Sequence, residues 1–291
     1  DDAMPCRDQA EADATHGVAL ANIFVDAPYN RTGFTLVSTQ ADRLTAAIVR
    51  LSRAALQLRD LRSHVATHPR LGIVDHISLH PLGSLSESAV AATAVAGQKP
   101  LEPAPALPVY LYGFAHPSRR CLSEVRRQLG SNGNGTYQPQ PQPPPLPDPD
   151  DLLRFPPDLG PSEPPPQSGL VTIGAVPWVV NYNVPLQDVD LAEAKWLARA
   201  VSERGGGLPG VEAMALKHAD DTVEVACNLL DETLSSPHAV QARLEALASS
   251  RGLDQWAVLW GYRTNKSPEE LLHAAAAALA AKAAEQRRRG G

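Results

Sequence analysis

The stretch VEAMALKHADDTVEVACNLLD, residues 211–231, carries the strongest strand signal in the chain. Apolar and polar residues alternate on both sides of the short segment HADD, which predicts strands over 211–217 and 222–229 joined by a tight turn. Working outward from this hairpin, the expected elements are a strand at 178–182, a helix at 189–204, a helix at 237–249 and a strand at 256–260.

These elements follow the order β-α-β-β-α-β, which is the split βαβ or ferredoxin-like arrangement. The earlier part of the chain can be interpreted in the same way, although its opening strand and helix are reduced. We therefore expect an α/β (α+β) protein with two ferredoxin-like subdomains, residues 1–175 and residues 176–291. The expected elements of the first are strands at 19–25, 33–38, 71–79 and 108–112, and helices at 42–62, 87–97 and 118–129.

Two further segments complete this interpretation. The Pro-rich stretch 131–153 is expected to be an exposed loop outside both cores, because successive prolines cannot donate backbone hydrogen bonds to a sheet. It is either a passive linker or an SH3-type ligand. A last helix of the second subdomain should begin at Ser267, where Pro268 and Glu270 complete a capping-box start.

Composition excludes several classes of function. The chain has 291 residues with a net charge of −6, so it is a poor candidate for binding nucleic acid through phosphates. No apolar run reaches the roughly 18 residues needed to span a bilayer, so we expect no membrane span, and the first residues lead us to expect no secretory signal. Its three cysteines are sparse and widely spaced, which argues against a disulfide framework and favours a reducing, cytoplasmic location.

The densest polar cluster lies between His64 and His80, where four of the nine histidines fall within 17 residues. Pro69 disfavours helical geometry at His68 and places that imidazole at the end of an element. Three interpretations remain open from the residues alone: a zinc site, satisfied structural histidines, or a general base at His68. Zinc is disfavoured, because Pro69 separates the cluster into a helix end and a strand.

Two other clusters could take part in a site. The segment Asp26-Ala-Pro-Tyr-Asn30-Arg31 is a turn signal, but Asp26 could orient an imidazole and Arg31 could bind a carboxylate. The segment from Gly160 to Gly169 is a rigid Pro-rich turn that lacks the spacing of a P-loop or a Rossmann fingerprint.

Several motifs together resemble the formiminotransferase domain of the formiminotransferase-cyclodeaminase family. The segments NRTGFTLVS (30–38) and HPRLGIVDH (68–76) are similar to the family's NRTVYTFVG and HPRMGALDV. Likewise, EVACNLLD (224–231) is similar to QVSTNLLD. Further matches are LPVYLYG (107–113), PDLGPS (157–162) with Gly169 after it, and NYNVPL (181–186). The motifs NYNVP and VDHISLHPL are most similar to the shorter, single-domain plant members.

This resemblance implies two ferredoxin-like subdomains with a folate cleft between them, and a homodimer as a candidate assembly. The implied reaction moves a formimino or formyl group between a glutamate-type donor and tetrahydrofolate, the co-substrate, without a metal. The implied catalytic residues are His68 as acid/base and Asp26 as its partner. The implied folate- and substrate-binding residues are Asn30, Arg31, Arg70, Gly160, Pro161, Ser162, Gly169, Asn181 and Asn183.

The chain also departs from the family pattern. Thr67 stands where the family has an acidic residue, and Val176-Pro177 stands where it has a basic pair. Residues 162–169, SEPPPQSG, include no aromatic residue, whereas the family's folate loop contains aromatic residues. An alternative function is therefore that of a non-catalytic folate-binding or scaffolding relative that keeps the fold.

Overall fold

The computed structural model describes residues 17–66, 68–96, 106–129, 147–218 and 222–289. The chain forms two compact units. The first unit contains the chain up to Val25, Thr32–Val176 and the chain from Pro268 onward. The second unit contains Asp26–Arg31 and Pro177–Ser267. The division into subdomains of residues 1–175 and 176–291 stays a prediction.

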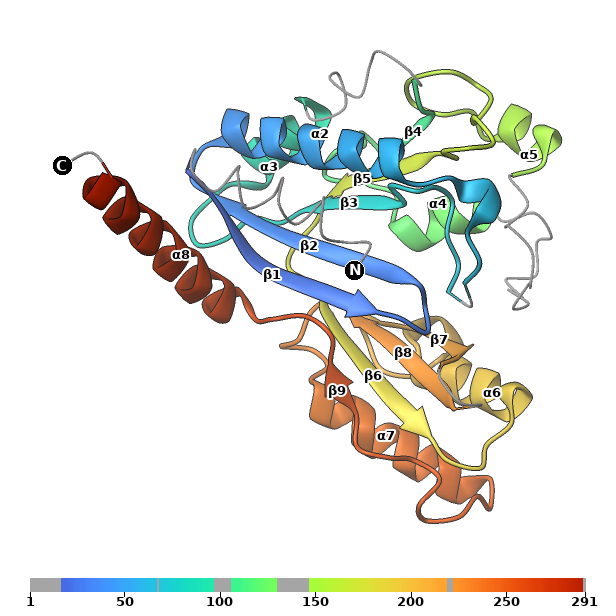
Figure 1. Cartoon of the computed structure of the whole chain (residues 1–291). Coiled ribbons are helices and arrows are strands. Elements are labelled where there is room, and N and C mark those ends of the chain that lie inside the picture. The colour runs from blue at the N-terminus through green and yellow to red at the C-terminus, as the bar shows by residue number, and fades with distance from the viewer. Residues whose placement is uncertain (1–16, 67, 97–105, 130–146, 219–221, 290–291) are drawn as a thin grey trace. The chain divides into compact units, whose positions relative to one another are not determined.

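The second unit has the predicted β-α-β-β-α-β order (Figure 1). Its sheet has the strand order β7-β8-β6-β9, and all neighbouring strands are antiparallel. The elements are β6 (Val180–Leu186), α6 (Leu191–Val201), β7 (Val211–Lys217), β8 (Val223–Leu229), α7 (Pro237–Ser250) and β9 (Tyr262–Arg263).

Caps and side-chain alternation explain these elements. Asp190 accepts a hydrogen bond from the Glu193 amide at the start of α6, and Ser236 does the same for Ala239 at the start of α7. Alternate residues of β6 and β8 are buried against the two helices, as in a half-covered sheet. The intervening side chains, including Asn183 and Glu224, therefore project from the opposite face of the sheet.

The predicted last strand is displaced. Val258 makes only an isolated bridge with Leu186, and the paired strand is β9, a few residues later. Asp254 explains the shift, because its side chain accepts a hydrogen bond from the Trp256 amide at 2.8 Å and its carbonyl accepts one from Ala257. The apolar run thus begins as a turn, and Trp256 and Trp260 are exposed.

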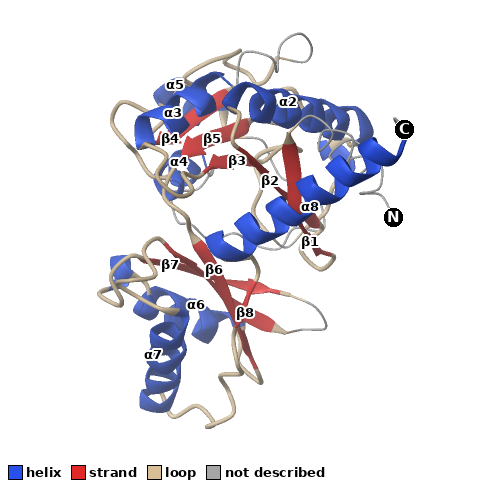
Figure 2. Ribbon diagram, turned by 90° about the vertical axis from the view of Figure 1, so that its left-hand side faces the viewer, coloured by secondary structure: helices blue, strands red, loops and turns tan. Residues whose placement is uncertain are grey.

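The first unit contains a three-stranded parallel sheet of order β3-β5-β4 and the β1-β2 hairpin (Figure 2). The strands are β1 (Val18–Asp26), β2 (Arg31–Ser38), β3 (His76–Leu79), β4 (Val109–Gly113) and β5 (Val171–Ala175). The helices are α2 (Ala41–Leu58), the 3-10 turn η2 (Leu61–Ser63), α3 (Glu87–Ala96), α4 (Leu122–Leu129), α5 (Pro149–Arg154) and α8 (Pro268–Arg289).

Three predictions for this unit need correction. Strand 71–79 begins only at His76, because Leu71–Asp75 forms a turn closed by the Asp75 side chain. The central strand β5 was not predicted, since five buried residues after a Pro-rich segment carry no alternation. A second β-α-β-β-α-β repeat is not found among the described strands, whose neighbours in the main sheet are all parallel.

The end of the Pro-rich stretch is also different from the prediction. Residues 130–146 lie outside the described part of the chain. Asp148 accepts a hydrogen bond from the Asp150 amide, and Pro149 occupies the first turn, so helix α5 begins here. Leu152 on this helix is 7% exposed and packs in the cluster that contains Tyr110 and Leu129. Stretch 131–153 therefore does not lie wholly outside the core.

No helix in the described residues is long and apolar enough to cross a membrane.

Candidate functional site

His68 lies in the first unit, half-buried just after η2. Its Nδ1 atom is 2.9 Å from the backbone carbonyl oxygen of Pro69. Because a carbonyl oxygen only accepts hydrogen bonds, Nδ1 carries the hydrogen when the ring is neutral, and Nε2 is then the basic nitrogen. The Pro69 carbonyl thus fixes the tautomer, a role that the family resemblance implied for Asp26.

The backbone ties the His68 segment to the end of the Gly160–Gly169 loop. Gly72 and Gly169 form an isolated antiparallel bridge. The Leu170 amide donates to the Leu71 carbonyl at 3.0 Å, and the Ile73 amide donates to the Ser168 carbonyl at 2.9 Å. Since Gly72 and Gly169 are 97 positions apart, the structure brings together two motifs that are distant in the sequence.

The other end of this loop is also anchored. The Val109 amide donates to the Leu159 carbonyl at 2.9 Å. Gly160 has a φ of +81°, and a Cβ atom there would lie 2.2 Å from the Leu107 carbonyl oxygen. Between the two anchors, Pro161 is half-buried and Ser162 is exposed. The loop thus has fixed ends and presents Ser162 to solvent.

Asp75 and Arg70 hold the HPRLG turn itself. Asp75 accepts a hydrogen bond from the Leu71 amide at 2.5 Å and forms an ion pair with Arg126 of α4. Burial alone would raise the pKa of Asp75, but the Arg126 charge and the Leu71 amide outweigh it and lower that pKa. Arg70 donates to the His64 carbonyl, so this predicted folate ligand stabilises its own segment.

Replacing Arg126 by methionine should lower the free energy of unfolding by about 1–3 kcal/mol at pH 7, because Asp75 would lose its charged partner. The pKa of Asp75 is lower in the folded than in the unfolded state. The pair therefore stabilises fully above the unfolded pKa of about 4, and this contribution is lost as the pH falls through the folded value.

Urea unfolding of both proteins between pH 7 and pH 3 measures the effect. The difference between wild type and Arg126→Met should shrink as the solution becomes acidic. Arg127→Met, an exposed change on the same helix, is the control and should have little effect. A difference that stays constant down to pH 3 would contradict the assignment.

The second unit contains a group around two buried carboxylates that we call the carboxylate cluster: Asp26, Tyr29, Asn183, His218, Glu224 and Tyr262. Glu224 of β8 is 2% exposed. It accepts hydrogen bonds from Tyr262 Oη at 2.8 Å, Asn183 Nδ2 at 3.0 Å and Tyr29 Oη at 3.2 Å. These neutral donors satisfy a carboxylate that would otherwise be costly to bury.

Asp26 lies beside Glu224 in this cluster, at the end of β1 and 7% exposed. Its Oδ1 atom accepts a hydrogen bond from the Tyr29 amide at 2.9 Å and lies 3.3 Å from His218 Nε2. The turn is closed by Asn30, which adopts a φ of +47°. Arg31 places its guanidinium 5.2 Å from the centre of the Tyr29 ring.

The two tyrosines of the cluster stay neutral over a wide pH range. Burial raises the pKa of both Tyr29 and Tyr262, and the charge and hydrogen bonds of Glu224 raise each pKa further. Both hydroxyls therefore remain hydrogen-bond donors to Glu224, and the cluster gains no further negative charge from them.

The predicted site residues fall into two groups. In the first unit, His68 and Arg70 lie directly before the segment 71–73, whose backbone is hydrogen-bonded to the end of the Gly160–Gly169 loop. In the second unit, Asp26 and Asn183 both lie in the carboxylate cluster. Asn181 lies on the same strand as Asn183 but donates to Asn228 Oδ1 at 2.7 Å. Because His68 and Asp26 belong to different units, their pairing stays a prediction.

Sequence reasoning missed Tyr29, His218, Glu224 and Tyr262. A glutamate in an alternating strand normally faces solvent, so nothing in the pattern indicated that Glu224 is buried. His218 belonged to the HADD segment and was assigned to a turn. The signal that could have found Glu224 is its position in a motif similar to QVSTNLLD, because the chain has a carboxylate where that motif has an amide.

The other histidines of the first cluster have partners of their own. His76 Nε2 lies 2.9 Å from Tyr112 Oη, and His80 Nδ1 lies 3.1 Å from the Val176 carbonyl oxygen. Within the described ranges, no three His, Cys, Asp or Glu side chains converge as metal ligands. That the protein needs no metal stays a prediction.

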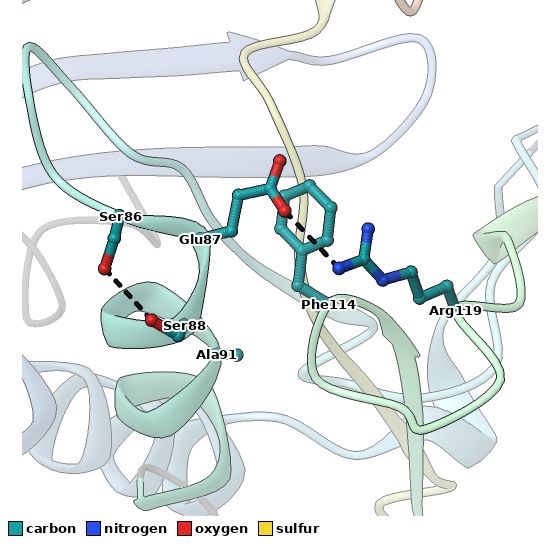
Figure 3. Close-up of a pocket in the computed structure, with 6 residues that line it drawn as sticks. All are labelled: Ser86, Glu87, Ser88, Ala91, Phe114 and Arg119. Atoms are coloured by element: carbon teal, nitrogen blue, oxygen red, sulfur yellow. Dashed lines mark hydrogen bonds and ion pairs between the residues drawn. The ribbon is translucent and has the colours of Figure 1, made fainter.

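Figure 3 shows a separate open depression of about 550 Å³ on the first unit. Its lining residues are Ser86, Glu87, Ser88, Ala91, Phe114 and Arg119. Arg119 lies over the Phe114 ring and forms a 3.5 Å ion pair with Glu87. None of the predicted site residues lines this depression, and its cation already faces an acidic partner.

Comparison with known proteins decides the family. The family described as formiminotransferase domain, N-terminal subdomain, matches residues 8–176. A formiminotransferase cyclodeaminase-like protein of Arabidopsis thaliana is 37% identical over 261 residues, which is 87% of this chain and 85% of the relative. The chain belongs to the formiminotransferase family. It is thus a member of a family of transferases.

Other relatives of this formiminotransferase chain differ in length. The formimidoyltransferase-cyclodeaminase of Gallus gallus is 31% identical over 78% of this chain, which spans only 41% of that relative. The glutamate formimidoyltransferase of Thermoplasma acidophilum is 29% identical over 73% of this chain and 67% of its own length. The chain therefore spans about two fifths of the length of the bird relative and most of the plant one.

Proposed function

We propose that this formiminotransferase chain is a folate-binding one-carbon transferase. It would move a formimino or formyl group between a glutamate-type donor and tetrahydrofolate, which serves as co-substrate. The observation that carries the proposal is the tautomer of His68, which leaves Nε2 basic, in a segment whose continuation at Gly72 pairs with Gly169 of the Gly160–Gly169 loop. The names of the relatives, which include a glutamate formimidoyltransferase, support the same reaction class.

In the proposed chemistry, His68 first accepts a proton and later returns it. The N5 atom of tetrahydrofolate forms a bond to the amidine carbon of the donor, and His68 Nε2 takes the N5 proton. The bond between that carbon and the glutamate nitrogen then breaks, and the imidazolium returns its proton to the departing nitrogen. The folate cleft and the contribution of Asp26 stay predictions.

Binding and turnover together test this proposal. Calorimetric titration with 5-formyltetrahydrofolate should give saturable binding, and incubation with formiminoglutamate and tetrahydrofolate should release glutamate. Saturable binding without glutamate release would instead favour the non-catalytic folate-binding alternative. The absence of both folate binding and glutamate release would overturn the proposal.

A cytoplasmic location and a homodimer belong to the same proposal. Cys121 is an exposed free thiol, which suits a reducing compartment. Cell fractionation and analytical ultracentrifugation measure the location and the assembly. Recovery in an oxidising compartment, or sedimentation as a monomer, would contradict the respective part.

A further inference from the structure

We propose that His218 is a positioning residue, held as an imidazolium between Asp26 and Glu224, and that it fixes the Asp26 carboxylate for the transfer reaction. The part that concerns transfer rests on the proposed function above. The part that concerns charge involves the second unit alone and can be measured without turnover.

The geometry of the ring carries the inference. His218 Nε2 lies 3.3 Å from Asp26 Oδ1, and His218 Nδ1 lies 3.8 Å from Glu224 Oε1. The side chains of the two carboxylates are only 6% and 3% exposed. A neutral imidazole has one N–H, so its other nitrogen would present a lone pair to a buried carboxylate. A doubly protonated ring avoids this repulsion and gives each carboxylate a positive partner.

The His218 ring also contacts an aromatic side chain. The edge of the ring packs on Tyr29, with ring centres 4.8 Å apart, and Tyr29 stays neutral. Tyr262 donates a hydrogen bond to Glu224, and the Arg31 guanidinium lies 5.2 Å from the centre of the Tyr29 ring. Within the described part of the chain, the ion-pair contacts of His218 are those with Asp26 and Glu224. With a neutral ring the group would bury two negative charges, and with an imidazolium it buries a net charge of one.

His218 helps to hold the carboxylate of Asp26 in place. The Tyr29 amide and His218 both approach the same oxygen of its carboxylate, Oδ1. This arrangement fixes the orientation of the carboxylate. The family motif QVSTNLLD has an amide at the position of Glu224, so this chain places a second carboxylate in the cluster. His218 balances the charge that Glu224 introduces.

Imidazole resonances of labelled protein test the charge directly. The His218 signal is assigned as the one that disappears in His218→Gln, and exposed His238 on α7 serves as the reference. At neutral pH both ring nitrogens of His218 should carry a proton, which their ¹⁵N chemical shifts report. Glu224→Gln should decrease the population of the doubly protonated ring, because an anionic neighbour is removed. One unprotonated ring nitrogen in the wild type, or no change in Glu224→Gln, would overturn the charge assignment.

Turnover tests the positioning role. His218→Gln should lower kcat by about 10- to 100-fold with little change in the KM for folate, because a misplaced carboxylate affects the chemical step. His238→Gln should leave both values unchanged. Circular dichroism and urea unfolding establish that each variant is folded. Glu224→Gln changes the shape of the side chain less, so it is a second variant for the charge measurement if His218→Gln does not fold.

The outcomes separate the two proposals. An active wild type with a neutral His218, or an active His218→Gln with unchanged kcat, overturns this inference and leaves the proposed function standing. An inactive wild type with a charged His218 overturns the proposed function and the positioning role together, while the charge assignment stands.

Discussion

Replacement of His68 by alanine is expected to lower the turnover number by about 10²- to 10⁴-fold, which is the usual contribution of a positioned acid/base. Its Nε2 atom is the basic nitrogen, because Nδ1 is committed to the Pro69 carbonyl. Affinity for 5-formyltetrahydrofolate should change little, since the ring is assigned to proton transfer. Steady-state release of glutamate and calorimetric titration measure the two effects separately.

Two further variants sharpen this prediction. His273 is an exposed histidine on α8 of the same unit, so His273→Ala is the matched control and should keep full turnover. His68→Gln keeps a polar side chain but cannot accept and return a proton at neutral pH, so it should be as slow as the alanine variant. Full turnover in either His68 variant would rule out His68 as the base.

The parts of the fold that sequence could predict are those set by local chemistry. Strand β7 has the predicted bounds, since its alternation stands between a Gly-rich segment and a turn. Helix α7 begins at Pro237, as predicted. Strand β5 could not be predicted, because its stability comes from pairing with β3 and β4, which lie 60 to 95 residues away along the chain.

In the candidate site, too, only the features set by local sequence could be predicted. His68 could be singled out because Pro69 constrains it locally, and Asp26 because it opens a turn signal. Their surroundings could not be predicted. The hydrogen bond from Tyr29 to Glu224 joins residues 195 positions apart, and no local pattern contains that contact. The tautomer of His68 likewise depends on one carbonyl oxygen whose direction only the folded backbone determines.

Replacement of Gly169 by alanine is expected to have the second large effect, a loss of stability. It has a φ of +73°, and a Cβ atom there would lie 2.2 Å from the Leu71 carbonyl oxygen and 2.7 Å from Gly72 Cα. An alanine would therefore be strained and would also push the two backbones apart. We expect Gly169→Ala to lower the free energy of unfolding by about 3–5 kcal/mol. Urea unfolding measures this value.

Gly83 isolates the cause, because it has a similar φ of +65° and a Cβ atom there would have no neighbour within 4 Å. Gly83→Ala has only the conformational cost of about 1–2 kcal/mol. The excess in Gly169→Ala therefore measures the close approach that holds the His68 segment against the loop. Folate affinity, measured where the variant is still folded, should fall in Gly169→Ala and stay unchanged in Gly83→Ala. Equal losses of stability in the two variants would show that the Gly72–Gly169 contact is not tight in solution, and the loop would then be free to separate from His68.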